Sequence, residues 1–285
     1  MIQLVLTYGH AEFTRVCIDS IYKNTPPEEI NLVVWDNLSE DRLDETDIDS
    51  SNTALLKLDN NYGSSNAVNY LMDVGERLGQ DVMYISNDHY MFPGWSTPFL
   101  EGGPVDIASP WTPFGLHIEG DVPFWNDANK AQHNKLKPKY LDHPESKAKI
   151  LKFLKIIYPE GEQAFLDKHI LTLPTVSHVG QLWTGCYHIK KEALKKIPRY
   201  RTDVGLSGGE DYDWYNNCRK LGLTTGVYCR SYAHHFQCVT IQRMHLSMDH
   251  GDTNEVFGKV PPPAFTDEGK SIMNIGEEKL KQIIK

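Results

Sequence analysis

The chain has 285 residues, of which 40% are hydrophobic and 24% are charged, and its formal net charge is −9 at pH 7. A chain of this length can bury a substantial core, either as one large domain or as a domain with an appendage. The acidic balance argues against indiscriminate binding to nucleic acids or anionic membranes, although a local basic patch can override the average.

The five cysteines, Cys17, Cys186, Cys218, Cys229 and Cys238, are odd in number and form no C-x-x-C pair. This pattern favours neither a disulfide framework nor a zinc cluster, and a reducing cytoplasm is the simplest environment for them. The chain shows no basic leader with a cleavage site, and no apolar run approaches the roughly 20 residues of a membrane span. We therefore expect a cytoplasmic protein without a transmembrane segment.

The first half of the chain alternates strands and helices. Its apolar runs are nearly continuous, which is typical of parallel strands that are covered on both faces. Ligands of such sheets bind beyond the carboxyl ends of the strands, so the polar residues at those ends are the candidates for function. The predicted strands are residues 2–8, 30–36, 53–59 and 81–88, and the predicted helices are residues 11–24 and 64–79.

The middle of the chain, from residue 111 to about residue 179, is irregular and rich in proline, histidine and aromatic residues. Residues 130–155 carry eight lysines against two acids, Asp142 and Glu145, and the pattern predicts an amphipathic helix over residues 145–158. A solvated, lysine-decorated surface helix is the simpler interpretation, and a patch that meets an anionic partner is the functional one.

Regular structure is predicted again after this insertion. We expect one domain over residues 1–250, made of a first half (1–110), the insertion (about 111–179) and a second half (180–250), followed by a tail (251–285). The second half contains predicted strands at residues 180–189 and 224–235 and predicted helices at residues 190–197 and 208–223, and the tail ends in a predicted helix at residues 276–285.

The strand over residues 81–88 ends in Asp88, which is followed by His89 and by the turn residues Pro93 and Gly94. A carboxylate beyond the end of a central strand can bind a hard divalent cation, which takes waters or phosphates as its other ligands. The competing interpretation is that Asp88 only caps the turn. The residue alone does not decide between the two.

Glu210 and Asp211 stand in the first turn of a predicted helix that two glycines precede. Acids are common there because they complement the helix dipole and cap free amides. Asp211 shares helical spacing with Trp214, Cys218 and Leu221, which predicts that it faces inward. An inward-facing acid at a helix start is a candidate for a general base.

Two histidines, His234 and His235, end the last predicted strand. Because neighbouring residues of a strand point to opposite faces, only one of the two can face a site at this edge of the sheet. An imidazole is a reasonable ligand for Mn²⁺ beside a carboxylate.

Polar residues also follow the second and third predicted strands. Asp36 and Asn37 follow the second, where a carboxylate could accept hydrogen bonds from a nucleobase edge, although a turn is expected there in any case. Asn61 and Gly63 precede a helix whose N-terminus could face a phosphate.

Taken in order along the chain, these landmarks resemble glycosyltransferase family 2. The segments of this chain are "TYGHAEF", "VVWDNLS", "NYGSSNAVN", "SNDHYMFPGW" and "GEDYDWYNNCRKLGL", and a histidine follows one strand later. The corresponding family patterns read near "TYNRPE", "VVDNGS", "N-x-G…A-x-N", "NNDVVVPPGW" and "GEDVDLCLRARRAGY". The resemblance covers residues 2 to 100 and 180 to 236, and its specificity lies in the order of the segments.

The resemblance implies an α/β class protein with the GT-A fold, a Rossmann-like α/β/α sandwich with a mostly parallel central sheet and, here, a helical or irregular insertion on the acceptor side. It implies an inverting hexosyl- or pentosyltransferase that moves a sugar from a nucleoside-diphosphate sugar to an acceptor hydroxyl. The residues that it places around the nucleotide sugar are Thr7, Tyr8, Glu12, Asp36, Asn37, Asn61, Gly63 and Asn87.

The resemblance also implies a cofactor and a base. Asp88 takes the place of the final acid of the DXD-type metal motif and, with one of His234 and His235, is expected to hold Mn²⁺ or Mg²⁺ on the diphosphate. The metal neutralises charge on the departing nucleoside diphosphate. Asp211 is expected to take the proton from the acceptor hydroxyl, with Glu210 beside it to help place the acceptor.

The chain departs from the family pattern in three places. Ser86 stands at the first acidic position of the metal motif, the "TYGHAEF" segment lacks Asn-Arg-Pro, and the insertion matches nothing in the family. The insertion is therefore where we expect acceptor choice to be encoded. Its lysines suggest an anionic acceptor, either a phosphate-bearing glycan or lipid carrier or DNA with hydroxylated bases. The acceptor-side candidates are Trp183, Lys135, Lys137 and Lys139.

Other nucleotide-binding classes fit less well. The chain lacks the G-x-G-x-x-G of dinucleotide-binding oxidoreductases after its first strand, and it lacks the G-x-x-x-x-G-K-[ST] of P-loop enzymes. It also lacks the glycine-rich loop that opens sugar-phosphate nucleotidyltransferases. The remaining alternative is a catalytically inactive nucleotide- or carbohydrate-binding protein on the same scaffold, which Ser86 favours and the pair Glu210 and Asp211 opposes.

Overall fold

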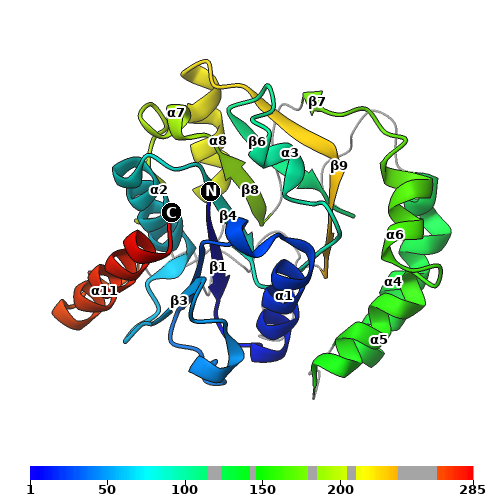
Figure 1. The fold of residues 1–285 in the computed structure, drawn as a ribbon, viewed down its shortest axis with the longest axis horizontal. Helices are drawn as coiled ribbons and strands as arrows, with labels where there is room; N and C mark the ends of the chain where they lie inside the picture. Colours follow the sequence, from blue (N-terminus) through cyan, green and yellow to red (C-terminus); the bar gives the residue numbers. More distant parts are fainter. Residues whose placement is uncertain (114–122, 142–145, 179–184, 204–209, 237–261, 285) are drawn as a thin grey trace.

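A computed structural model describes residues 1–113, 123–141, 146–178, 185–203, 210–236 and 262–284 (Figure 1). Among these residues, nine strands form one sheet with the order β3-β2-β1-β4-β8-β6-β9-β5, and β7 pairs with β9 outside that path. Helices cover both faces of the sheet, so the described part of the chain is a three-layer α/β/α sandwich.

The first half of the sheet is entirely parallel, as the strand pattern predicts. β1 pairs with both β2 and β4, and β2 pairs with β3. The helices between the strands begin close to where the sequence places them. These elements are β1 (Ile2–Thr7), α1 (Ala11–Asn24), β2 (Leu32–Asp36), β3 (Thr53–Lys57), α2 (Gly63–Leu78) and β4 (Val82–Ser86), with short 3₁₀ turns at Pro27–Glu29 and Glu45–Asp47.

The second half of the sheet is mixed. β8 runs antiparallel to β4 and β6, β9 runs parallel to β6, and β5 and β7 run antiparallel to β9. The register between β6 and β9 shifts at Pro110, a residue that lacks the amide hydrogen a regular ladder needs. The strands are β5 (His89–Met91), β6 (Ile107–Trp111), β7 (Ser177–His178), β8 (Cys186–Ile189) and β9 (Thr225–His235).

The strands bury alternate residues in two hydrophobic cores. On β1, Val5 packs in the core that includes Cys17 of α1, whereas Leu4 packs in the core that includes Leu71 of α2. The first core also receives α3 (Thr97–Leu100), and the second also receives α7 (Lys191–Leu194) and α8 (Glu210–Lys220). Burial on both faces explains why the strands read as continuous apolar runs.

The insertion forms a stack of helices beside α1 and β9, on the right of Figure 1. The helix predicted over residues 145–158 is α5, whereas α4 was not predicted because most of its residues are polar and Pro138 lies near its end. The described elements are a 3₁₀ turn (Pro123–Trp125), α4 (Asp127–Tyr140), α5 (Lys147–Ile157), α6 (Glu162–Phe165) and a π-helical turn (Leu166–Ile170).

The final helix, α11 (Asp267–Ile283), begins at Asp267 rather than at Gly276 because the Thr266 hydroxyl caps it by accepting a hydrogen bond from the Gly269 amide. It packs against β3, on the left of Figure 1. The close approach needs a residue without a side chain, since a Cβ at Gly276 would lie 2.4 Å from the Leu56 side chain.

No helix in the described part of the chain combines the length and apolar character that crossing a membrane requires. The four described cysteines, Cys17, Cys186, Cys218 and Cys229, are free and buried, as expected from their number and spacing.

Candidate functional site

Asp88, His89 and His235 converge where β4, β5 and β9 meet, and we call this group the Asp88 cluster. Asp88 follows β4, and the antiparallel pairing of β5 with β9 sets His89 directly opposite His235. The two imidazole rings stack with their centroids 4.4 Å apart and their planes 2° apart. One potential ligand atom from each of the three residues lies within 4.8 Å of the others.

Hydrogen bonds hold the cluster in place. Asp88 Oδ1 accepts a hydrogen bond from Ser86 Oγ at 2.6 Å, and Asp88 Oδ2 lies 3.1 Å from His235 Nε2. His89 Nδ1 lies 3.1 Å from the Ser86 carbonyl oxygen, so the tautomer that donates to this carbonyl leaves a lone pair on Nε2. His89 Nε2 is buried and makes no hydrogen bond to any described residue.

The protonation states of Asp88 and His89 are those of metal ligands. Burial would raise the pKa of the Asp88 carboxyl, but His235, its hydrogen bond, His89 and the Ser86 hydroxyl hold that pKa well below 3.8. Burial, helped by His235, lowers the pKa of His89 to about 3. Asp88 is therefore anionic and His89 is neutral near pH 7.

The donor set suits a divalent cation. One carboxylate and two imidazoles match the ligands that Mn²⁺ accepts, and the hydrogen bond from Nδ1 to a carbonyl is the usual support of a ligating histidine. The unpartnered Nε2 of His89 would otherwise be a buried polar atom without a hydrogen bond, which is costly.

Gly185, which immediately precedes β8, permits this arrangement. Its carbonyl accepts a hydrogen bond from the Ser86 amide at 2.6 Å. A Cβ at this position would lie 2.4 Å from Ser86 Oγ and 3.4 Å from His89 Cε1, so a larger residue would displace the support of Asp88.

His234 lies on the opposite side of β9 from the cluster, so His235 is the one of the two histidines that faces Asp88. Its Nδ1 is 2.7 Å from the Tyr158 hydroxyl, which in turn is 2.6 Å from the Tyr232 hydroxyl. His234 is fully buried among residues of the insertion and of β9. We call this group the insertion cluster; it comprises Trp125, His133, Phe153, Tyr158, Tyr232 and His234.

Thr7 and Asn87, which were expected at the nucleotide, instead form hydrogen bonds inside the protein next to the site. Asn87 Nδ2 donates to Thr7 Oγ1 at 3.2 Å and to Thr14 Oγ1 at 3.0 Å, and the two threonine hydroxyls are 2.8 Å apart. All three residues are buried. Their hydrogen bonds join the ends of β1 and β4 to α1, directly beside Asp88. Tyr8, which follows Thr7, is half-buried.

The end of β2 offers one unused acceptor. Asn37 Oδ1 accepts hydrogen bonds from Trp35 Nε1 and from the Tyr62 amide, both at 3.0 Å, so it is engaged inside the protein. Asp36 Oδ1 accepts from the Ser39 amide at 2.8 Å, whereas its buried Oδ2 makes no hydrogen bond to a described residue and lies 3.9 Å from Arg42 Nε.

Glu12 contacts the insertion. Its Oε1 pairs with Arg15 at 2.7 Å, and its Oε2 accepts a hydrogen bond from the Lys147 amide at 2.6 Å, at the first residue of α5. A carboxylate at a helix N-terminus is a favourable partner, so Glu12 connects α1 to α5.

Asn61 and Gly63 form the turn into α2. Asn61 Oδ1 accepts a hydrogen bond from the Gly63 amide at 3.0 Å, and Gly63 has a φ of 76°, a conformation that glycine adopts without strain. This turn lies beside the end of β2, because the Tyr62 amide donates to Asn37.

Comparison with known proteins identifies the fold that carries this site. No family model matches the chain, and no curated protein matches it in sequence. In structure, it resembles GalNAc-T7 in complex with UDP, GalNAc and Mn²⁺, with a TM-score of 0.53 and 12% identity over 82% of this chain and 43% of that chain. The protein has a GT-A-like glycosyltransferase fold. It spans less than half of the length of GalNAc-T7.

Two further solved structures align at lower scores. S. aureus TarS 1–349 gives a TM-score of 0.46 at 13% identity, covering 82% of this chain and 59% of that chain. The mannosyltransferase PcManGT from Pyrobaculum calidifontis, in complex with GDP-Man and Mn²⁺, gives 0.47 at 15% identity, covering 99% and 72% respectively.

The GT-A-like fold contains the helix that carries the expected base. α8 begins at Glu210, and Trp214 and Cys218 of the predicted stripe are buried on it, whereas Leu221, just past its end, is exposed. The side chains of Glu210 and Asp211 lie outside the described part of the structure, as does Trp183.

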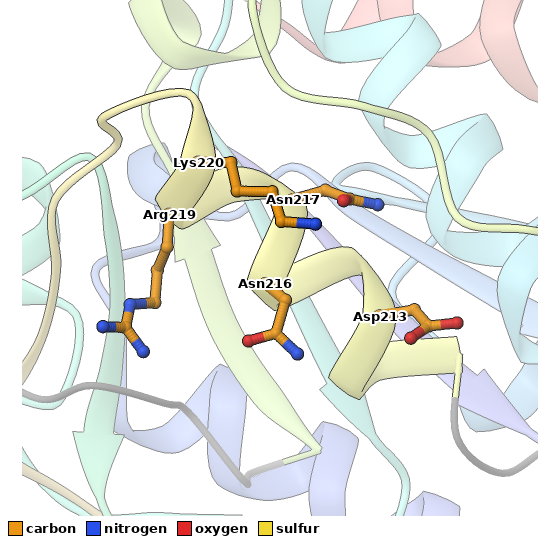
Figure 2. Close-up of a pocket in the computed structure, with 5 residues that line it drawn as sticks. All are labelled: Asp213, Asn216, Asn217, Arg219 and Lys220. Atoms are coloured by element: carbon orange, nitrogen blue, oxygen red, sulfur yellow. The ribbon is translucent and has the colours of Figure 1, made fainter.

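A polar surface pocket lies along the same helix (Figure 2). Asp213 and Asn216 project from the side of α8 that faces the viewer, and Arg219 projects farther along it. The lining residues are Asp213, Asn216, Asn217, Arg219 and Lys220. Because this lining includes no member of the Asp88 cluster, we place the candidate site at the cluster rather than here.

The lysines of the insertion divide into two kinds. Lys135 and Lys139 are exposed on α4, as an anionic contact requires, whereas Lys137 is only 7% exposed. Lys137 is therefore a poor candidate for contact with a large acceptor.

The expected ligand set did not include His89, and Ser86 stands where the metal motif has its first acid. The sequence signal was the uninterrupted polar run Ser86, Asn87, Asp88 and His89, in which a histidine follows the acid directly. Ser86 supports Asp88 through a hydrogen bond, so its presence at the first acidic position is compatible with the site.

Proposed function

We propose that this protein is a divalent-metal-dependent glycosyltransferase of the family 2 type, which transfers a sugar from a nucleoside-diphosphate sugar to an acceptor hydroxyl with inversion. The observation that carries the proposal is the Asp88 cluster, a carboxylate and two imidazoles at the edge of a GT-A-like sheet. The Mn²⁺ in the GalNAc-T7 structure supports a divalent cation.

Asp88, His89 and His235 would hold Mn²⁺ or Mg²⁺. When bound, the cation supplies neutralisation of the negative charge on the leaving nucleoside diphosphate. The Ser86 hydroxyl orients Asp88, and the Ser86 carbonyl orients His89. Both ligand side chains are therefore held in place before the metal binds.

The end of β2 would bind the base of the nucleotide. Asp36 Oδ2 is a buried carboxylate oxygen without a hydrogen bond to the described residues, and an N–H on a nucleobase edge would satisfy it. Asn61 and Gly63, in the turn beside it, would line the same site together with Tyr8. Thr7, Asn37 and Asn87 would not contact the nucleotide. They would stabilise the site indirectly, because their hydrogen bonds fix the ends of the strands.

Asp211 would remove the proton from the acceptor hydroxyl, which then attacks the anomeric carbon, and Glu210 would help to place the acceptor. Their position in the first turn of α8 supports this assignment, because the helix itself is packed in the core through Trp214 and Cys218.

The insertion would select the acceptor, for which we propose a glycan or lipid-linked sugar that carries negative charge, with hydroxylated DNA as the other anionic class. Lys135 and Lys139 expose their charge on α4, and Trp183 would contribute an aromatic surface. Charge reversal at Lys135 and Lys139 should weaken acceptor binding, and DNA is ruled out if duplex DNA does not bind at low salt.

The test measures binding and turnover of a panel of nucleoside-diphosphate sugars with and without Mn²⁺. Asp88→Asn should bind Mn²⁺ about 100-fold more weakly or worse, since even outer-shell changes cost 10–100-fold. Asp211→Asn should keep donor binding and lose turnover. Asp127→Asn, which changes an exposed carboxylate on α4, is the matched control and should change neither.

Two outcomes would contradict the proposal. If no donor binds in the presence of Mn²⁺, the chain is not a transferase of this type. If a donor binds with Mn²⁺ but is never turned over with any acceptor or with water, the inactive binding protein on the same scaffold is the correct function.

A further inference from the structure

The N-terminus of α11 is joined to the turn between β3 and α2 by a closed hydrogen-bond network, although the two segments are 204 residues apart in sequence. Asp59 Oδ2 accepts a hydrogen bond from Thr266 Oγ1 at 2.5 Å, and Asp59 Oδ1 accepts one from the Tyr62 hydroxyl at 2.8 Å. The Thr266 amide donates to the Tyr62 hydroxyl at 3.3 Å. We call these residues and Gly269 the α11 clamp.

Each hydroxyl group of the clamp both donates and accepts a hydrogen bond. Thr266 Oγ1 donates to Asp59 and accepts from the Gly269 amide at 2.9 Å, so one side chain both caps the helix and binds the turn. The Tyr62 hydroxyl donates to Asp59 and accepts from the Thr266 amide. A network in which every group is satisfied fixes the positions of its members.

The residues around the clamp are closely packed. The ring of Phe265 lies 4.4 Å from the ring of Tyr62, which is fully buried. A Cβ at Gly269 would lie 2.6 Å from the Tyr62 hydroxyl and 3.0 Å from Asp59 Oδ1. The helix therefore reaches the turn only because this position is glycine.

The far side of the same turn faces the proposed nucleotide site. The Tyr62 amide donates to Asn37 Oδ1 beside Asp36, and Asn66 Nδ2 donates to the Tyr62 carbonyl at 2.9 Å. Tyr62 thus contacts α11 through its hydroxyl and the end of β2 through its amide. Asn61 and Gly63 are its immediate neighbours in the chain.

The docking of α11 depends on few buried residues. Of its 17 residues, only Gly269, Gly276 and Leu280 are buried. Elements with little buried apolar surface open locally at a low free-energy cost. Partly buried Ile272 and Met273 also pack against the core and Glu277 pairs with Arg77, so α11 is docked over a limited surface, and the clamp connects its docking to the turn.

We propose that the α11 clamp positions the Asn61–Gly63 turn for the nucleotide, so that docking of α11 and binding of the nucleoside diphosphate strengthen each other. Tyr62 and Thr266 are positioning residues in this scheme. The inference rests on the proposed function, because it takes the turn to be part of a nucleotide site. Linkage requires the coupling to be reciprocal, which gives two separate measurements.

The first measurement is the Kd of UDP and of GDP in the presence of Mn²⁺, by calorimetry. Tyr62→Phe and Thr266→Val should weaken the nucleotide that the wild type binds by about 5- to 10-fold, the size expected for one net hydrogen bond. Thr266→Ser keeps the hydroxyl and should restore wild-type affinity. Mn²⁺ binding in the absence of nucleotide should be unchanged in all variants, because the clamp does not touch the Asp88 cluster.

The matched control is Tyr70→Phe. Tyr70 also lies on the α2 side, and its hydroxyl donates to the Met273 carbonyl of α11 at 3.3 Å. Like Tyr62→Phe, this substitution removes a tyrosine hydroxyl that bonds to α11, but Tyr70 lies away from the turn. Nucleotide affinity should stay within about 2-fold of the wild type, a change worth about 0.4 kcal/mol at most.

The second measurement is amide hydrogen exchange over α11 with and without the nucleotide. Exchange should slow on binding in the wild type and in Tyr70→Phe, and it should not slow in Tyr62→Phe or Thr266→Val. If the wild type binds a nucleotide and the clamp variants bind it equally well, the positioning role is wrong while the proposed function stands. If the wild type binds no nucleoside diphosphate in the presence of Mn²⁺, the positioning role and the proposed function are both wrong.

Discussion

The last residues of β9 separate two environments that differ in kind. His235 faces the Asp88 cluster, where a carboxylate and two imidazoles meet, whereas His234 faces the insertion cluster, where its nearest polar partner is the Tyr158 hydroxyl. The first group has the chemistry of a ligand site, and the second joins the insertion to the sheet. Two identical neighbours on one strand therefore have different roles, because successive side chains point to opposite faces.

The comparison predicts a large difference between the two histidines. His235→Ala should weaken Mn²⁺ binding by about 100-fold, since it removes a proposed ligand. His234→Ala should leave Mn²⁺ affinity within about 3-fold, because its ring points away from the cluster. Titration calorimetry with Mn²⁺ alone measures both. An equal loss of Mn²⁺ affinity in the two variants would show that the two faces of β9 do not have separate roles.

A smaller effect is expected when the insertion cluster alone is changed. Tyr158→Phe should lower the free energy of unfolding by about 1–3 kcal/mol, because the substitution leaves His234 Nδ1 without its partner in the core. Denaturant titration measures the loss. Mn²⁺ affinity is the internal control, and a change in it comparable to that of His235→Ala would show that the two faces are not separate.

The support of Asp88 gives a third test. Gly185→Ala should weaken Mn²⁺ binding by about 10-fold, because the new Cβ would displace the Ser86 hydroxyl. Ser86→Ala removes the same hydrogen bond without adding volume, and it should act in the same direction. Retention of full affinity in both variants would show that Ser86 does not position Asp88.

The last expected effect concerns pH, and it vanishes near neutral pH. Burial lowers the pKa of His89 to about 3, that of His133 to about 4 and that of His234 well below 6.5. These side chains stay neutral in the folded protein while they protonate in the unfolded chain, so their stabilisation is present above pH 6.5 and is lost as the pH falls toward the folded pKa.

His133→Phe tests this pH dependence on the insertion side. Removal of one such histidine should flatten the dependence of unfolding free energy on pH by up to about 1.4 kcal/mol per pH unit between roughly pH 6 and pH 4. Denaturant midpoints at several pH values measure the slope. A slope identical to that of the wild type would mean that His133 protonates in the folded state as readily as in the unfolded chain.

The sequence predicts the parallel half of the sheet well, because β1, β2, β3 and β4 are buried on both faces and their apolar runs are unambiguous. It predicts the position of Asp88 for the same reason, since the end of β4 is clear. The mixed half is harder to predict. β6 contains Pro110, and β5 has only three residues, so neither shows a strand pattern.

The environment of individual side chains could not be read from local pattern. The choice between His234 and His235 depends on which face of β9 meets the insertion, and the partner of Glu12 is an amide 135 residues away. The burial of Lys137 likewise follows from the packing of α4 and α5, whereas the local sequence suggests an exposed lysine. Such contacts are set by tertiary structure, for which a single sequence without homologues holds little information.

The order of strands in the sheet also has a consequence for synthesis. β5 follows β4 directly in the chain, but its partner is β9, so Asp88 and His235 are 147 residues apart. At roughly 5–20 residues per second, the ribosome needs about 7–30 s to make that stretch. A nascent chain that has completed β1 to β5 contains Asp88 and His89 but still lacks His235, and Mn²⁺ binding would report that translation has passed β9.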